Sequence, residues 1–224
     1  MKFSELLNIV EEEPVFSTSL LLAGAVQPAE IYQQLSYWEK TGRILQLRRG
    51  LYALAPPWQK VRPHPFSVAN AMVPGSYVSC QSALAHVGLI PEWVPMVTSV
   101  STGRPGIWQT PLGEYWFRHI RESLFFGYRR IEVVTGQHAF VARPEKALLD
   151  LIHLQPEGDS REYLAELRLQ NWERFDLDTF AGMVERGGRP KLRRALRVVE
   201  QLCFEQAGES RITVPDSGAG REKE

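Results

Sequence analysis

The feature that most restricts the fold lies between residues 27 and 54, where a helical pattern passes directly into two short extended runs. Pro28 is typical of a first helical position, because proline there loses no amide hydrogen bond. The apolar residues that follow at helical spacing are Ile31, Leu35 and Trp38. Their i, i+4, i+7 pattern predicts one buried stripe, and Gly42 is expected to end the helix.

The two extended runs, residues 43–47 and 51–54, predict a β-hairpin around Arg48-Arg49-Gly50, because glycine supplies the conformation that a tight turn needs. Two short helices are expected before this unit. They cover residues 3–10, with Pro14 marking the end, and residues 20–22, with Ser17 or Thr18 as cap and Gly24 as closing residue. Three helices and a hairpin within residues 1–57 indicate a winged helix-turn-helix, a DNA-binding unit.

The face of the 28–41 helix that lies opposite its buried stripe suits nucleic acid. It carries small, amide, hydroxyl and cationic side chains and no acid. Together with Gln27 at the helix start, they are Ala29, Tyr32, Gln33, Ser36, Tyr37 and Lys40. Arg43, Arg48 and Arg49 of the hairpin are expected to neutralise backbone phosphates. The predicted partner is double-stranded operator DNA, and the alternative is a winged helix that docks a protein.

A proline-rich linker, residues 55–66, separates this unit from a larger mixed α/β domain expected over residues 66–205. The expected helices cover residues 79–87, 144–154, 160–170, 176–186 and 190–205, and the expected strands cover 94–101, 113–120, 124–134 and 138–142. Residues 206–224, rich in glycine, serine and charge, are expected to form a disordered tail. The predicted fold class is α+β, with an N-terminal winged helix-turn-helix and C-terminal helices.

The net charge of zero conceals an uneven distribution of the 26 basic and 26 acidic residues. Residues 26–62 sum to +4, residues 144–185 to −6 and residues 186–197 to +6. The last segment holds a second basic patch, made of Lys191, Arg193, Arg194 and Arg197. Two interpretations stay open for this patch: contact with nucleic acid, or pairing with the acidic stretch 144–185.

Glu145, Lys146 and Asp150 invite a catalytic interpretation, but their spacing favours a structural one. Lys146 and Asp150 are four residues apart on a helix and suit an ion pair, while Glu145 in the first turn complements the helix dipole. The histidines show no metal-binding spacing, and His86 is expected to be a buried, hydrogen-bonded histidine. The sequence predicts no catalytic residue, no metal and no cofactor.

The composition indicates a cytoplasmic protein. Cys80 and Cys203 are the only cysteines, too few for a disulfide framework. The first residues are rich in glutamate, unlike a signal peptide, and the apolar run at residues 20–26 is far shorter than the ~20 residues of a membrane span. No membrane segment is therefore expected.

Four segments carry short motifs in a fixed order. They are AVQPAEIYQQL with GRILQLRRGLY (residues 25–35 and 42–52), YVSCQSALAHVGLIP (77–91), VTSVSTGR (97–104) and ARPEKALLDL (142–151). These segments resemble those of AbiEi-type antitoxins from bacterial type IV toxin–antitoxin systems, over roughly residues 10–155. The resemblance implies a transcriptional autoregulator, or repressor, with a C-terminal antitoxin domain. Its implied functional partner is a nucleotidyltransferase-like toxin, with no stable complex required, and the alternative is a free-standing regulator without antitoxin activity.

Overall fold

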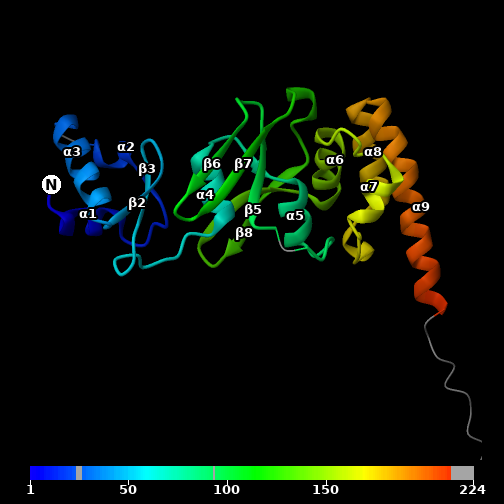
Figure 1. Ribbon diagram of the computed structural model, residues 1–224, viewed down its shortest axis with the longest axis horizontal. Helices are drawn as coiled ribbons and strands as arrows, with labels where there is room; N and C mark the ends of the chain where they lie inside the picture. Colours follow the sequence, from blue (N-terminus) through cyan, green and yellow to red (C-terminus); the bar gives the residue numbers. More distant parts are fainter. Residues whose placement is uncertain (24–26, 93, 213–224) are drawn as a thin grey trace, which may run out of the picture.

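The computed structural model describes residues 1–23, 27–92 and 94–212, with side chains described as far as residue 205. Three parts follow one another along the long axis of the molecule: a small N-terminal unit, a six-stranded sheet with its helices, and a layer of C-terminal helices (Figure 1). The α+β class, with an N-terminal winged helix-turn-helix and C-terminal helices, is confirmed.

The N-terminal unit has the element order of a winged helix. Its elements are α1 (Phe3–Val10), β1 (Phe16–Ser17), α2 (Thr18–Leu21), α3 (Pro28–Lys40), β2 (Ile44–Arg48) and β3 (Leu51–Leu54). The strands form an antiparallel sheet in the order β1-β3-β2. Gly42 after α3 and Gly50 in the β2–β3 turn have φ angles of 67° and 81°, a region that favours glycine. Gly24, the expected end of the second helix, lies outside the described residues.

The hairpin contributes to two hydrophobic cores. A small core inside the N-terminal unit joins α1, α2 and α3 to the sheet through Leu6, Val10, Phe16, Leu21, Ile31, Leu35, Trp38, Ile44, Tyr52 and Leu54. Leu47, Leu51 and Ala53, from the same two strands, belong instead to the core of the larger sheet. The hairpin is therefore packed against the second part of the chain.

The second part is built on a mixed sheet in the order β6-β7-β5-β4-β9-β8. Its strands are β4 (Tyr77–Val78), β5 (Met96–Ser101), β6 (Gly106–Thr110), β7 (Gly113–His119), β8 (Tyr128–Val134) and β9 (Gln137–Ala142). The pairs β5–β7 and β4–β9 are parallel, and the others are antiparallel. Two helices, α4 (Pro65–Met72) and α5 (Cys80–His86), and a 3₁₀ turn, η1 (Glu122–Leu124), complete this part.

Among these helices and strands, α4, β4 and β6 have no counterpart in the sequence prediction. β4 has only two residues, and α4 and β6 have proline or glycine at or beside their ends, so their sequences resemble a linker and a turn. β6 also lies at the edge of the sheet and alternates only between exposed and half-buried residues, a weak strand pattern.

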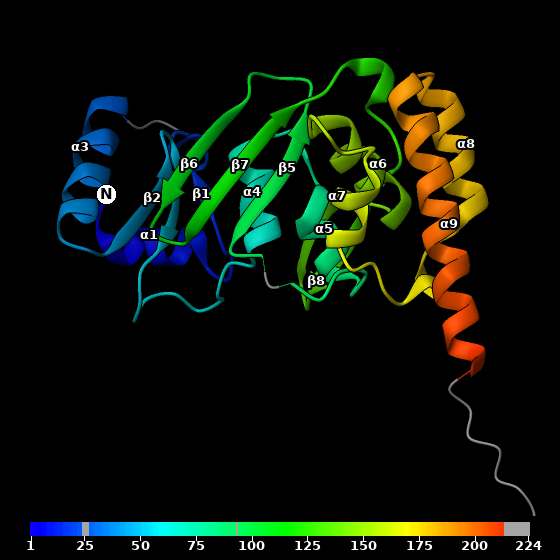
Figure 2. The ribbon, with the colours of Figure 1, turned by 45° about the vertical axis from the view of Figure 1, so that its right-hand side comes forward.

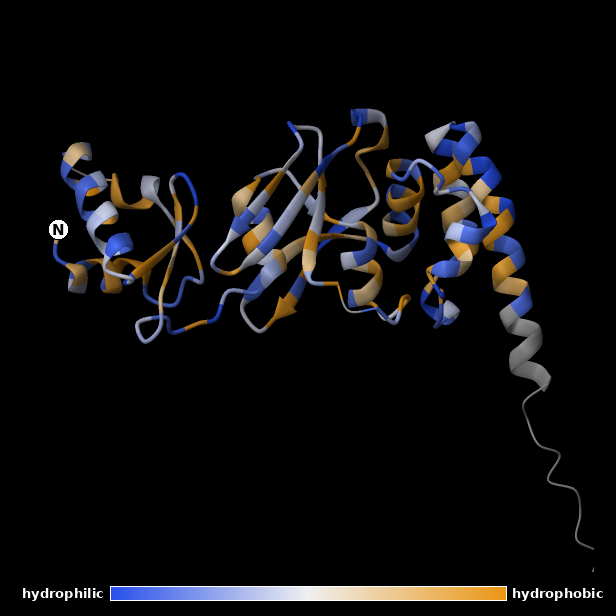
Figure 3. Cartoon of the chain, viewed as in Figure 1, coloured by the Kyte–Doolittle hydropathy of each residue, from blue (hydrophilic) through white to orange (hydrophobic). Residues whose placement is uncertain are grey.

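Helices dominate the remainder of the chain. They are α6 (Pro144–Leu154), α7 (Arg161–Glu166), the 3₁₀ turn η2 (Trp172–Arg174), α8 (Leu177–Gly187) and α9 (Pro190–Ile212). The end of α9 projects beyond the other helices (Figure 2), and polar and apolar residues are mixed along α9 (Figure 3). The helix α9 runs to Ile212, seven residues past the expected end at residue 205, because a single glycine at position 208 does not end the helix. Residues 213–224 lie outside the described part.

Candidate nucleic-acid interface

The helix α3 lies at the end of the molecule that is farthest from the large sheet (Figure 1). Its inward stripe is buried, with Ile31, Leu35 and Trp38 only 2%, 1% and 4% exposed. The predicted outer residues, Gln27, Ala29, Tyr32, Gln33, Ser36, Tyr37 and Lys40, are all exposed. The rings of Tyr32 and Tyr37 are covered by no neighbouring element, since these residues are 55% and 57% exposed. This outer surface, called here the α3 face, is free to meet a partner.

Acidic residues stand at the two margins of the α3 face. Glu30 and Glu39 are both exposed, and at 100° per residue they lie just outside the arc from Tyr32 to Tyr37. Lys40 supplies the one formal positive charge within the arc. The α3 face therefore presents hydrogen-bonding and aromatic groups, and most of the attraction to phosphate has to come from outside it.

Arg43 rests on an aromatic cluster at the base of the hairpin. Its guanidinium carbon lies 5.1 Å from the centre of the Phe3 ring, and that ring makes edge contacts of 5.4 Å with both Trp38 and Trp58. The Arg43 amide also donates to the carbonyl of Trp38 near the end of α3 (2.8 Å). Arg43 is thus held beside the C-terminal end of α3, half-buried, with its orientation set by cation–π packing.

Arg48 has a partner within the chain that the sequence did not reveal. Its Nη1 donates to the carbonyl oxygen of Met72, the last residue of α4, and Leu47 and Leu51 beside it are buried in the larger core. The last carbonyls of a helix lack partners within the helix, and an arginine satisfies one of them here. Arg48 therefore fixes the hairpin to the second part of the chain. Arg49 is exposed and has no partner among the described residues, so of the two turn arginines it is the one whose guanidinium is wholly available to phosphate.

The second basic patch is largely engaged within the chain. Arg193 forms an ion pair with Glu185 (3.0 Å), Arg194 with Asp159 (2.7 Å), and Lys191 donates from Nζ to the carbonyl oxygen of Gln155. Both acids belong to the 144–185 stretch, so the intramolecular pairing is the arrangement present in the structure. Arg197 is exposed and has no partner within the described part of the chain.

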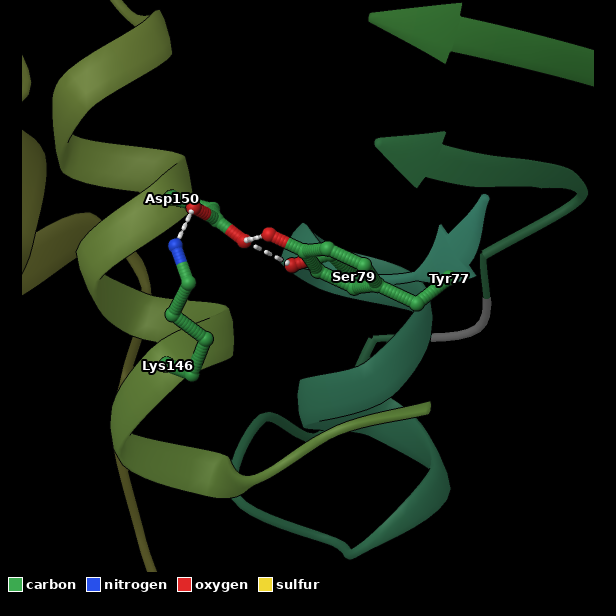
Figure 4. Close-up of polar contacts among 4 residues, drawn as sticks. All are labelled: Tyr77, Ser79, Lys146 and Asp150. Atoms are coloured by element: carbon green, nitrogen blue, oxygen red, sulfur yellow. Dashed lines mark hydrogen bonds and ion pairs between the residues drawn. The ribbon is translucent and has the colours of Figure 1, made fainter. Parts of the chain in front are cut away.

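Two of the motif segments meet in a buried polar cluster (Figure 4). Lys146 and Asp150 of α6 form the expected ion pair and are both 0% exposed. The other carboxylate oxygen, Asp150 Oδ2, accepts hydrogen bonds from the hydroxyls of Tyr77 (2.9 Å) and Ser79 (2.8 Å). Burial raises the pKa of Asp150, and the ammonium and the two hydroxyls oppose that rise. The cluster ties α6 to β4.

The participation of Tyr77 and Ser79 is not evident from the sequence, although both stand in the 77–91 motif. Glu145 is also used structurally, because its Oε1 accepts from the amide of Asp176 at the start of α8 (2.9 Å). The expectation of a buried His86 is wrong. The residue as a whole is exposed at the end of α5, and one side of its ring is covered by Phe66, with the ring centres 5.2 Å apart.

The described part of the chain holds no group of three or more histidine, cysteine or acidic side chains placed to bind a metal ion. Within that part, none of the helices combines the length and the apolar character that a bilayer crossing requires.

Comparisons with known proteins bear on the fold. No protein-family model matches the sequence, and no curated protein matches it. Among solved structures, the chain is similar to the crystal structure of the RV2827C protein from Mycobacterium tuberculosis. The TM-score is 0.52 at 16% identity, over 88% of this chain and 75% of that chain. At this identity the similarity concerns the fold alone.

Proposed function

We propose that this protein is a transcriptional regulator that binds double-stranded DNA through the α3 face. The observation that carries the proposal is the combination of a winged-helix element order with an α3 face that is fully exposed and free of acids. Amide and hydroxyl side chains at helical spacing match the donor and acceptor pattern of base edges in the major groove. Lys40 and Arg49 then supply charge for the flanking phosphates.

Gln33 and Ser36 lie near the middle of the α3 face and are the residues proposed to contact base edges. A glutamine can make two hydrogen bonds to adenine, and a good bidentate contact contributes ~1–3 kcal/mol of discrimination between bases. Tyr32 and Tyr37 flank them and can pack on the sugar–phosphate backbone. In this scheme the helix specifies the sequence and the cations fix the position of the unit on the duplex.

The proposal is tested by fluorescence anisotropy, with DNA from upstream of the gene and the full-length protein at several salt concentrations. Gln33→Ala should weaken specific binding about tenfold while leaving non-specific binding unchanged. Gln201→Ala, an exposed glutamine on α9, is the matched control and should change neither. Absence of salt-dependent binding to any upstream fragment would overturn the proposal.

We further propose an antitoxin activity, which rests on the resemblance of the four motif segments to AbiEi-type antitoxins. The buried cluster supports it, because segments 77–91 and 142–151 contribute interacting residues to one folded unit. The test is growth rescue when the protein is co-expressed with a nucleotidyltransferase-like protein encoded beside it. Gln33→Ala should rescue growth as well as the natural chain does, since the antitoxin activity is assigned beyond residue 66. Lack of rescue by the natural chain would leave a free-standing regulator.

The competing function is a protein-interaction module, and the exposed tyrosines favour it specifically. Tyrosine is enriched in protein interfaces, and Tyr32 and Tyr37 are both more than half exposed. This alternative predicts that Tyr32→Ala abolishes co-purification of a partner protein and that no upstream DNA is bound at moderate salt. The anisotropy experiment therefore separates the two functions.

A further inference from the structure

A shallow cavity of about 460 Å³ lies between the start of β8, the start of α6 and one side of α8. Two arginines line it, Arg143 from the residue before α6 and Arg186 from the end of α8. No acidic residue is among its lining residues in the described part of the chain. Its volume falls within the range of roughly 300–1,000 Å³ that is typical of small-molecule sites.

In the described part of the chain, the two arginines of this cavity lack the acidic partner that five other exposed arginines have. Arg161, Arg168, Arg174, Arg193 and Arg194 are each ion-paired with a glutamate or an aspartate. Within the described residues, neither Arg143 nor Arg186 has an acidic partner, although both side chains are exposed at the same cavity. Two uncompensated cations that line one hollow repel each other and favour a bound anion.

The geometry of Arg186 suits a phosphate group. Its guanidinium carbon lies 3.9 Å from the centre of the Phe126 ring. Packing on an aromatic ring holds the guanidinium in place, while its N–H groups remain able to form paired hydrogen bonds to phosphate oxygens. Arg143 is positioned by its backbone, whose amide donates to the carbonyl of Gly127 (2.9 Å).

An aromatic wall completes the cavity. Phe126 and Tyr128 both line it. The Phe126 ring is buried and covered by the cations of Arg186 and Lys146, whereas the half-buried Tyr128 ring is held by stacking on Tyr77 at 4.5 Å. Aromatic rings bind nucleobases by stacking. Two arginines without acidic partners beside the Tyr128 ring match a ligand with a phosphate at one end and a planar base at the other.

We propose that this cavity binds the phosphate of a mononucleotide, with Arg143 and Arg186 as its ligands. The site is separate from the α3 face, and the proposal does not depend on DNA binding. Gly182 of α8 offers a direct way to close the cavity: it lines the space, and a β-carbon added there meets no atom within 4 Å. A larger side chain at this position fills the cavity while both arginines remain.

The test is titration calorimetry of the full-length protein with ATP, GTP, AMP, inorganic phosphate and adenosine. At least one nucleotide should bind, and adenosine should not. Arg143→Gln and Arg186→Gln should each weaken binding about tenfold or more, because charge-assisted hydrogen bonds are lost. Arg197→Gln, which removes an equally exposed and unpaired arginine outside the cavity, should have no effect.

Substitutions at position 182 provide a second test of nucleotide binding in the cavity. Gly182→Leu should abolish nucleotide binding, whereas Gly182→Ala should retain it and make α8 slightly more stable, since alanine is the better helix former. The proposal is overturned if no nucleotide binds, if the arginine variants bind normally, or if Gly182→Leu binds as well as Gly182→Ala. Binding of single-stranded RNA or duplex DNA without any mononucleotide would also overturn it. Gln33→Ala should bind nucleotide normally, which separates this result from that of the DNA experiment.

Discussion

The two basic segments of this chain look alike in sequence and differ in the structure. Residues 26–62 sum to +4 and residues 186–197 to +6. In the second segment, three of the four predicted patch residues are bound within the chain, two of them by acids. In the first, Lys40 and Arg49 are exposed and have no partner among the described residues. The predicted patch of the more highly charged segment is therefore mostly compensated within the chain, whereas Lys40 and Arg49 of the first segment stay available to a nucleic acid.

The difference arises from which elements lie beside each segment. α9 packs along α7 and α8, and the acids before and on those helices reach its arginines. α3 lies at the opposite end of the molecule, away from those acids (Figures 1 and 2). Exposed ion pairs add little stability, typically below ~1 kcal/mol, but they reduce the local potential that attracts phosphate. The net charge of a segment therefore indicates function only when the acids and bases that lie beside it in the fold are also known.

The buried cluster around Lys146 and Asp150 is the place where charges compensate each other most completely. Removing one of its charges should therefore have the largest effect on the free energy of unfolding. Asp150→Ala leaves the Lys146 ammonium buried without a counter-charge, and the free energy of unfolding should fall by about 3–5 kcal/mol. Urea denaturation measures the loss. Asp150→Ala combined with Lys146→Met should recover much of it, because no unpaired charge then stays buried. Equal stability of the single and double variants would show that the cost does not come from the charge.

The comparison of the two basic segments is tested directly by matched charge reversals. Lys40→Glu and Arg197→Glu change the net charge equally at exposed, unpaired positions. Lys40→Glu should weaken operator binding by about ten- to a hundredfold and lower its salt dependence, because a phosphate contact becomes a repulsion. Arg197→Glu should change the affinity by less than about twofold, since the screening length is only ~8 Å at physiological salt. Equal losses would place α9 in the DNA footprint.

Within the hairpin, substitutions of Arg48 and Arg49 should have different effects: the first on the free energy of unfolding and the second on DNA binding. Arg48→Ala removes a hydrogen bond to the α4 carbonyl, so the free energy of unfolding should fall by roughly 1 kcal/mol. Arg49→Ala should leave stability unchanged and reduce the slope of log affinity against log salt by about one. Thermal unfolding and anisotropy on the same preparations measure both. A salt slope that falls for Arg48→Ala and not for Arg49→Ala would reverse the assignment.

Local patterns were sufficient for much of the fold. Helical spacing located α3 and α6, and the alternating pattern with a glycine turn located β7 and the β8–β9 hairpin, because these elements bury one regular face. The strand order and the shared hairpin core were not accessible, since they depend on contacts between residues far apart in sequence. The helix α4 and the strands β4 and β6 escaped prediction because they are short, and α4 and β6 also have proline or glycine at or beside their ends.

The candidate site shows the same division. The exposed residues of α3 follow from helix geometry alone, and the Lys146–Asp150 pair follows from an i, i+4 spacing. Arg48 could not be assigned, because its partner is a backbone carbonyl 24 residues away in a helix that the sequence did not reveal. The hydrogen bonds from Tyr77 and Ser79 to Asp150 could not be predicted either, because more than 70 residues separate the partners in the sequence.

The smallest predicted effect concerns His153, near the end of α6, which responds to the cations around α9. Burial lowers the pKa of His153 first, and Arg189, Lys146, Lys191 and Arg121 lower it further. The unfolded chain, with an ordinary histidine pKa of about 6.5, therefore binds this proton before the folded chain does. The contribution of His153 to the free energy of unfolding should be fully present above that pH and decline as the pH falls from there toward the folded pKa.

His153→Gln should flatten part of this decline in urea titrations between neutral and mildly acidic pH. The part that remains belongs to His64 and His86, whose pKa values burial also lowers. Because burial is the largest cause of the lowered pKa and the cations come second, added salt should change the contribution of His153 only slightly. A large salt effect would mean that the cations, and not burial, set the pKa of His153.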